Sequence, residues 1–293
     1  MNEVLSQIKF FMLRKILLIA TFVISLNNAY SQTENRATLN YIFYNRSNSE
    51  NLHHLDQSNV DFNYFLKSKN IFKKVRWDNS FAYRTVFLEG SLNPNLQDLE
   101  YKSNFVFTKN VKNFLIGGVR FNMRSELQEN ISGNSLFPSV SFGYMRQSQS
   151  NKSIRWAIGV NYNNDFSRNA IILFAIFNYE TAKYRFNATL PNSVLFLVKH
   201  KPTFLYGLNA TLNASIFELQ NERTAYLQAI NANVAAFAQI KLKNKLWLDI
   251  KPGYTLLRRI DLLDANFERP NAAGFQNTLT NNFVMNVGLL YRM

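Results

Sequence analysis

The residues best suited to acid–base chemistry in this chain are its three histidines, His53, His54 and His200. His53 and His54 stand close to Asp56 and Ser58, so this segment holds the residue types of a Ser/His/Asp site, as a lipid-modifying hydrolase would need. Polar loops commonly carry such residues without catalysing a reaction. We therefore predict no catalytic residues and no enzyme activity, and keep a lipid-modifying enzyme as an alternative.

The acidic side chains give no clearer sign of a catalytic or metal site. Asp61, Asp78 and Glu100 lie near the ends of strand-like windows, and nothing in the sequence shows that they converge. Adjacent histidines on an extended chain point in opposite directions, which disfavours a metal ion shared by His53 and His54. The chain has no cysteine, Gly-rich phosphate loop, zinc-binding His/Glu motif or EF-hand pattern. We predict no metal site and no cofactor.

The elements that must position any functional side chain are β-strands, because apolar and polar residues alternate along most of the chain. In the window 153–163, Ile158 falls on the apolar face and Asn161 on the polar face. The last window has an unbroken apolar face made of Phe283, Met285, Val287, Leu289, Tyr291 and Met293. Such a face is typical of the closing strand of a β-barrel, although a soluble exported β-sandwich also alternates.

We predict an all-β, single antiparallel transmembrane barrel of fourteen strands, with twelve as an alternative because the windows at 170–179 and 182–200 are weak. The predicted strands are 37–45, 59–66, 75–88, 99–109, 113–123, 137–147, 153–163, 170–179, 182–190, 194–200, 204–217, 224–242, 245–258 and 280–293. An even number of strands places both ends of the barrel domain on one side of the membrane.

The predicted connections differ between the two sides of the membrane. Those at 109–113 and 242–245 are short, whereas those at 45–58 and 259–280, on the opposite side, are long and polar. Short periplasmic turns and long external loops are the pattern of outer-membrane barrels.

The apolar content fits strands better than helices. The longest nearly uncharged apolar stretch after residue 31, at 170–179, has ten residues, and a spanning helix needs about 20. A barrel strand needs only about 9–11 residues, of which alternate ones face lipid. The N-terminus has a basic pair, Arg14 and Lys15, followed by an apolar run and small residues up to Ser31. This pattern predicts a cleaved signal peptide at residues 1–31 and a barrel domain at 32–293.

Several short motifs support this interpretation. They are the Ser-Gln end of the signal, the aromatic strands, Phe-Asn-Ala-Thr-Leu-Pro-Asn at 186–192, Tyr-Gly-Leu-Asn-Ala at 206–210 and the Tyr291-Arg292 ending. With them the chain resembles outer-membrane β-barrel proteins of Bacteroidota that carry a domain of unknown function. Met293 stands where these proteins usually have a terminal aromatic residue. The resemblance implies the barrel fold and the outer membrane of a Gram-negative bacterium, and no established activity.

The formal net charge of +14 raises the question of what the barrel interior binds. The candidate lumen-facing charges are Arg84, Lys102, Arg120, Arg155, Lys183, Arg185, Lys241, Asp61 and Glu100. An open lumen lined in this way would be a porin-like channel for small anionic solutes. Alternatively, these side chains pair with one another and fill the interior of a structural barrel. Expected partners are outer-membrane lipid, lipopolysaccharide and the barrel-assembly machinery, and no nucleic acid.

Overall fold

The computed structural model describes ten ranges of the 293-residue chain. They are residues 35–47, 55–66, 68–89, 95–126, 133–148, 153–163, 170–219, 226–267, 276–278 and 282–292. The predicted signal peptide at 1–31 and the histidines His53 and His54 lie outside these ranges. Within them, no helix is long and apolar enough to cross a membrane.

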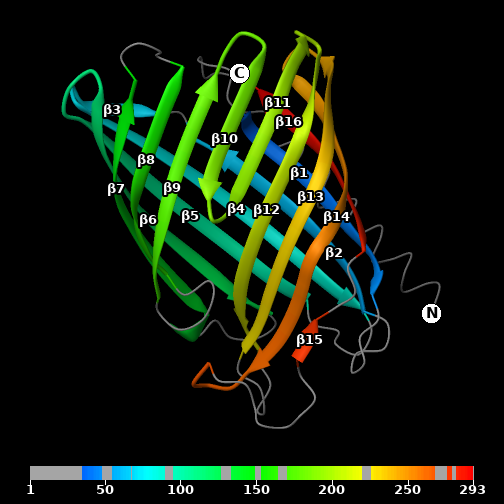
Figure 1. The fold of residues 1–293 in the computed structure, drawn as a ribbon. Helices are drawn as coiled ribbons and strands as arrows, with labels where there is room; N and C mark the ends of the chain where they lie inside the picture. The colour runs from blue at the N-terminus through cyan, green and yellow to red at the C-terminus, as the bar shows by residue number, and fades with distance from the viewer. Residues whose placement is uncertain are drawn as a thin grey trace.

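Fourteen antiparallel strands form a closed β-barrel (Figure 1). They are β1 (Asn35–Ser47), β2 (Leu55–Phe65), β4 (Val75–Glu89), β5 (Asn95–Thr108), β6 (Asn113–Ser125), β7 (Leu136–Gln147), β8 (Ile154–Asn163), β9 (Ala170–Glu180), β10 (Tyr184–Leu190), β11 (Ser193–Lys201), β12 (Phe204–Glu218), β13 (Tyr226–Lys243), β14 (Leu246–Leu263) and β16 (Phe283–Arg292). Each strand pairs with its neighbours in this order, and β16 pairs with both β14 and β1. The predicted barrel and its fourteen strands are confirmed, and the twelve-strand and sandwich alternatives are wrong.

Two short strands and one helical turn were not predicted. β3 (Lys69–Phe72) pairs with the start of β4, and β15 (Gln276–Thr278) pairs with the end of β14. The 3-10 turn η1 (Gly133–Ser135) directly precedes β7. Most predicted bounds agree with the strands within a few residues, but β14 continues to Leu263, beyond the predicted end at 258.

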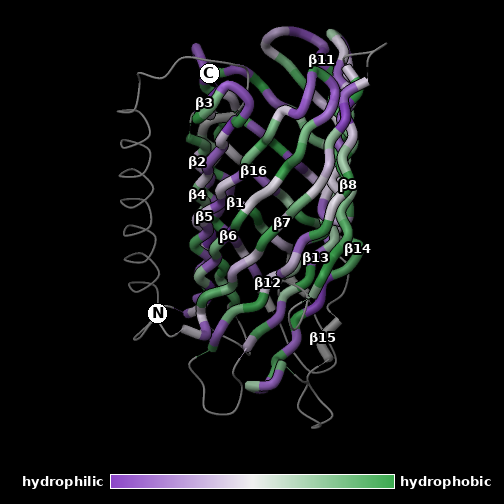
Figure 2. Tube along the Cα trace, turned by 90° about the vertical axis from the view of Figure 1, so that its left-hand side faces the viewer, coloured by the Kyte–Doolittle hydropathy of each residue, from purple (hydrophilic) through white to green (hydrophobic). Residues whose placement is uncertain are grey.

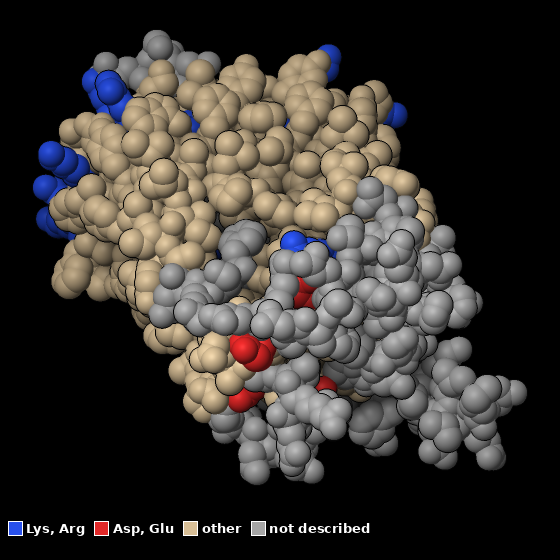
Figure 3. All heavy atoms as spheres, turned by 60° about the horizontal axis from the view of Figure 1, so that its bottom comes forward, with Lys and Arg blue, Asp and Glu red and all other residues tan. Residues whose placement is uncertain are grey.

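The outer face of the barrel is an apolar belt. Hydrophilic and hydrophobic residues alternate along the strands (Figure 2), and outward side chains such as Ile158 and Leu173 are 58% and 76% exposed. Figure 3 shows a broad uncharged surface, with Lys and Arg gathered mainly along its far edge and Asp and Glu at the near end. Exposed apolar side chains on this scale need a hydrocarbon solvent, so the strands cross a membrane.

The two ends of the barrel are joined in different ways. At the short-turn end, where β16 ends and β1 begins, β11 and β12 are joined by residues 202–203 and β13 and β14 by residues 244–245. Asn244 adopts a φ of 48°, which a two-residue hairpin turn requires and Asn tolerates well. At the long-connection end, residues 264–282 separate β14 from β16.

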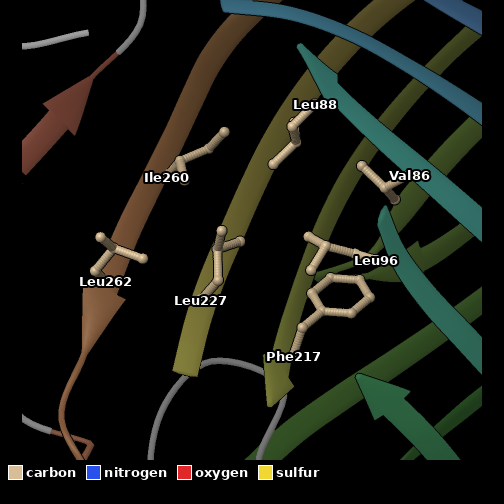
Figure 4. Packing of buried hydrophobic residues seen from close by; sticks show 7 residues of the cluster. All are labelled: Val86, Leu88, Leu96, Phe217, Leu227, Ile260 and Leu262. Carbon is tan, nitrogen blue, oxygen red and sulfur yellow. The ribbon is translucent and has the colours of Figure 1, made fainter. Parts of the chain in front are cut away.

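The interior is packed with apolar side chains toward the long-connection end. Figure 4 shows a cluster in which side chains from β12, β13 and β14 meet side chains from β4 and β5. The cluster consists of Val86, Leu88, Leu96, Phe217, Leu227, Ile260 and Leu262, all at most 6% exposed. These strands are not all neighbours in the wall, so the cluster lies across the interior and fills it there.

The end of β12 lies inside the barrel. Glu218 forms a bridge with Ser125 of β6, although five strands separate β12 from β6 along the wall. The Ser135 hydroxyl donates a hydrogen bond to the Glu218 carboxylate, and Ile216 packs with Phe137 of β7. These contacts hold the end of β12 against β6 and β7, beyond Thr211, its last residue that pairs with β11.

Candidate functional site

A polar cavity of about 240 Å³ lies in the middle of the barrel, next to the apolar cluster. Asp61 of β2 and Arg84 of β4 line it and form an ion pair of 2.9 Å between Oδ1 and Nε. Asn233 of β13 donates a hydrogen bond of 3.4 Å to the Tyr44 hydroxyl of β1, although the two strands are not neighbours. Side chains from opposite parts of the wall therefore connect across the cavity.

Arg258 of β14 makes the strongest of these cross-barrel connections. Its guanidinium donates two hydrogen bonds to Gln57 Oε1 of β2, at 2.8 and 3.1 Å, and lies 5.0 Å from the centre of the Tyr44 ring. Only 1% of Arg258 is exposed. This bidentate contact to one amide oxygen, together with the ring face, stabilises a buried charge that would otherwise be costly.

Sequence reasoning missed Arg258 because a β-bulge hides its orientation. Ala232 of β13 pairs with Leu257 and Asn233 with Thr255, so Leu256 is an extra residue in β14. A bulge reverses which residues of a strand face inward. The alternation therefore breaks near 256, which made residues from 259 onward resemble a polar loop.

The candidate charges on β5 and β6 form a second group. Glu100 and Arg120 are 3.9 Å apart, and Lys102 pairs in register with Arg120 on the same face of the sheet. The neighbouring pair of Asp98 and Arg124, 3.1 Å apart and buried, was not among the candidates. Basic and acidic side chains thus interleave here, as in the filled-interior alternative.

Two candidates lie at the short-turn end. Lys183 belongs to the turn between β9 and β10 and not to a strand, and its Nζ lies 5.4 Å from the centre of the Tyr184 ring. Arg155 is an exposed residue near the start of β8. Neither contributes to the central cavity.

The remaining candidates, Arg185 and Lys241, line a larger cavity of about 910 Å³ that opens at the short-turn end, which we name the vestibule. Its basic side chains are Arg185, Lys199, Lys201, Lys241, Lys245 and Arg292. Glu180 is its one acidic side chain among the described residues. Glu180 Oε1 accepts bonds from Arg185 at 2.6 Å and from Lys199 at 2.7 Å, which leaves Lys201, Lys241 and Lys245 without a carboxylate among the described residues of the vestibule lining.

Arg292 and Trp247 form part of the vestibule wall. The Arg292 guanidinium lies 4.4 Å from the centre of the Trp247 ring and also donates to Gln239 Oε1. Lys199, Lys245 and Arg292 were not predicted as site residues because each lies in or beside a turn or at a strand end. The available signal was that these residues are lysine or arginine. Only the closed barrel brings together the five strands and turns that carry the basic side chains of the vestibule.

The sequence matches one family model over most of the barrel. Residues 111–292 match the domain of unknown function DUF6268. The chain belongs to the DUF6268 family. No curated protein sequence matches this DUF6268 chain significantly.

Solved structures similar to this DUF6268 barrel are other β-barrels. The COG4313 outer membrane channel from Pseudomonas putida F1 shares 12% identity, with 91% of this chain and 98% of that chain covered and a TM-score of 0.42. The NanC porin shares 10% identity, with 87% and 100% covered and a TM-score of 0.39. The TodX monoaromatic hydrocarbon channel shares 8%, with 90% and 91% covered and a TM-score of 0.46.

The described part of the DUF6268 barrel offers no cluster of metal-ligating side chains. It has no group of three or more His, Cys, Asp or Glu side chains that could hold a metal ion. His200 lies on β11 beside the aromatic rings of Phe204 and Tyr206, with centroids 6.3 and 6.2 Å away. His200 thus lies at the rim of the short-turn end, one residue before β11 ends.

Proposed function

We propose that this DUF6268 protein is a channel-like outer-membrane barrel, without enzymatic activity, that admits small anionic molecules to its vestibule. The observation that carries the proposal is the excess of six basic side chains over one acid around a cavity of about 910 Å³. Fixed charges of one sign between low-dielectric walls raise the local concentration of ions of the opposite sign. The vestibule is therefore suited to bind anions.

The short turns indicate from which side of the membrane anions enter the vestibule. Short turns face the periplasm in outer-membrane barrels, so the vestibule opens to the periplasm. The apolar belt would contact outer-membrane lipid and lipopolysaccharide, after insertion by the barrel-assembly machinery. The signal peptide and the origin in Bacteroidota stay predictions.

The interior explains why the barrel would conduct only after a change of structure. The apolar cluster of Leu96, Phe217 and Leu227 with its neighbours lies between the vestibule and the long-connection end. We expect a closed resting state with infrequent openings.

Single-channel recording in planar bilayers at low salt tests the proposal, with protein whose folding is established by its heat-dependent gel shift. We expect steps that prefer anions, because screening of the vestibule charges is weakest at low ionic strength. Replacing two vestibule lysines, Lys241→Gln and Lys245→Gln, should lower this preference.

The matched control is the double variant Lys73→Gln and Lys74→Gln. It removes the same charge from the same end of the barrel, at residues that do not line the vestibule. Silence from folded protein would overturn the channel. Equal selectivity in the two double variants would overturn the role of the vestibule.

A further inference from the structure

The hydrogen-bonded wall of the barrel has a break between β9 and β12. The hairpin β10–β11 ends early: Leu190 pairs with Ala175 of β9, and Ser193 pairs with Thr211 of β12 (Figure 1). Beyond these pairs, residues 170–174 of β9 and 213–217 of β12 have no strand partner on the side of the hairpin among the described residues. Five residues of strand correspond to roughly 16 Å, about half the thickness of the hydrocarbon core.

The break lies within the apolar belt. Ile171 and Leu173, the outward residues of β9 beside it, are 74% and 76% exposed. An apolar groove crosses the outer faces of β7, β8 and β9 and ends at the hairpin turn, at Leu190 and Pro191. Its volume is about 890 Å³. The groove therefore leads along the lipid-facing surface to the break.

The inner face of the same hairpin is polar along β10, whereas β11 places Leu195 and Leu197 between its polar ends. Its vestibule end carries Arg185 and Lys199, followed by Asn187, and its last inward pair before the turn is Thr189 and Ser193. Asn187 and the turn are three residues apart, or about 10 Å along the strand. A row of polar side chains on β10 thus leads from the vestibule to the break, behind an outer face that is apolar.

Unpaired backbone groups at the break imply that water reaches it. Hydrocarbon offers no hydrogen-bond partner to backbone N–H and C=O groups, so the unpaired edge of β9 within the belt needs water from the interior, whereas the end of β12 lies inside the barrel. The break is therefore a junction between a hydrated interior and the membrane hydrocarbon.

We propose that the break is a lateral site for anionic single-chain amphiphiles, with the anionic headgroup on the basic and polar inward side chains Arg185, Lys199 and Asn187 of β10–β11 and the alkyl chain passing into the outer groove. This inference rests on the proposed function, because it uses the same vestibule, and it names the class of anion that the vestibule takes. A molecule of this kind matches both surfaces, whereas a compact hydrophilic anion would contact only the first.

Two brominated probes test the two ends of the site in protein refolded into liposomes. α-Bromododecanoate carries its bromine, a contact quencher of fluorescence, beside the carboxylate. It should quench Trp247 in the vestibule in a variant with Trp77→Phe and Trp156→Phe. ω-Bromoundecanoate carries bromine at the far end of its chain. It should quench a bimane fluorophore attached through Leu173→Cys, which is selective because the chain contains no cysteine.

The controls separate the site from bulk lipid. Bimane attached through Leu208→Cys, on an outward position of β12 that is 57% exposed, reports the probe dissolved in the membrane. We expect quenching at position 173 to saturate, to exceed that at 208, and to be displaced by plain dodecanoate. Neutral ω-bromoundecanol should quench 173 and 208 equally. Ala175→Phe, which fills the groove beside Leu190, should weaken quenching at 173, whereas Ala236→Phe on the outer face of β13 should not.

The outcomes distinguish the inference from the proposed function. Saturable quenching of Trp247 with equal quenching at 173 and 208 would overturn the lateral site and leave an anion-binding vestibule. Absence of saturable quenching at Trp247 as well would overturn both. Saturation at 173 that an Arg185→Gln and Lys199→Gln pair leaves unchanged would show an apolar groove without a headgroup site, and so would also overturn the inference.

Discussion

The long strands β12 to β14 and the short hairpin β10–β11 are neighbours in one barrel, but their inward faces have opposite roles. The long strands fill the interior, whereas the hairpin lines an open cavity. β13 and β14 have 18 residues each, and their inward side chains pack against β4 and β5 to fill the interior. β10 has seven residues and β11 nine, and their inward side chains line the vestibule. Strand length, and not the alternation that both share, determines whether the wall closes the interior or leaves it open.

The difference has a physical basis in how far each strand extends beyond its partners. A long strand can bend inward and gain contacts with the opposite wall, as β12 does at Glu218. The short hairpin β10–β11 ends early and leaves residues 170–174 of β9 and 213–217 of β12 without a strand partner on that side among the described residues. The same fold therefore combines a filled part with a part whose inward polar groups line the vestibule.

The largest expected effect comes from the filled part. Leu227→Ala removes a side chain with 0% exposure from the apolar cluster and should lower the free energy of unfolding by about 2–5 kcal/mol. Leu195→Ala, a half-buried inward position of β11 in the vestibule, should cost only about 1 kcal/mol. Denaturant titration of tryptophan emission in liposomes measures both. Equal losses would contradict the contrast between the two parts.

The next largest loss of stability is expected from a charge on the outer face of β8, on the side of the barrel near the short hairpin. Ile158→Arg places a charge in the apolar belt and should cost about 2–4 kcal/mol, whereas Asn161→Arg on the inward face of β8 should be much milder. The heat-dependent gel shift, recorded against denaturant concentration, compares the two variants. Equal tolerance would show that the assignment of the two faces is wrong.

The smallest losses of stability are expected from removing the carboxylate of two ion pairs, one in the interior and one in the vestibule. Asp61→Asn removes the carboxylate that binds Arg84 at 2.9 Å in the central cavity and should cost about 1.5–3 kcal/mol. Glu180→Gln should cost less than about 1 kcal/mol, because water screens a carboxylate that is 45% exposed. Glu180→Gln should instead strengthen anion preference in single-channel recordings, since it frees Arg185 and Lys199. A larger stability loss for Glu180→Gln than for Asp61→Asn would reverse the comparison.

The sequence predicted the strands well because alternation is a local property. The windows at 170–179 and 182–200, although weak, are strands β9 to β11. Prediction ended early in β14, where the bulge at Leu256 exchanges the two faces and Arg258 becomes an inward residue. The candidate site was predicted less completely: Arg185 and Lys241 line the vestibule with Lys199, Lys245 and Arg292, which the sequence left at strand ends or turns.

What the sequence determined by itself is therefore the barrel class, the number of strands and the faces of most of them, since each depends on residues two apart in one strand. The tertiary structure alone decided which strands are long enough to cross the interior and where the wall breaks. It also decided which charges meet, as in Arg258 with Gln57, 201 residues away in the chain. Such contacts depend on the tilt and register of strands around a closed sheet, and no local pattern encodes these.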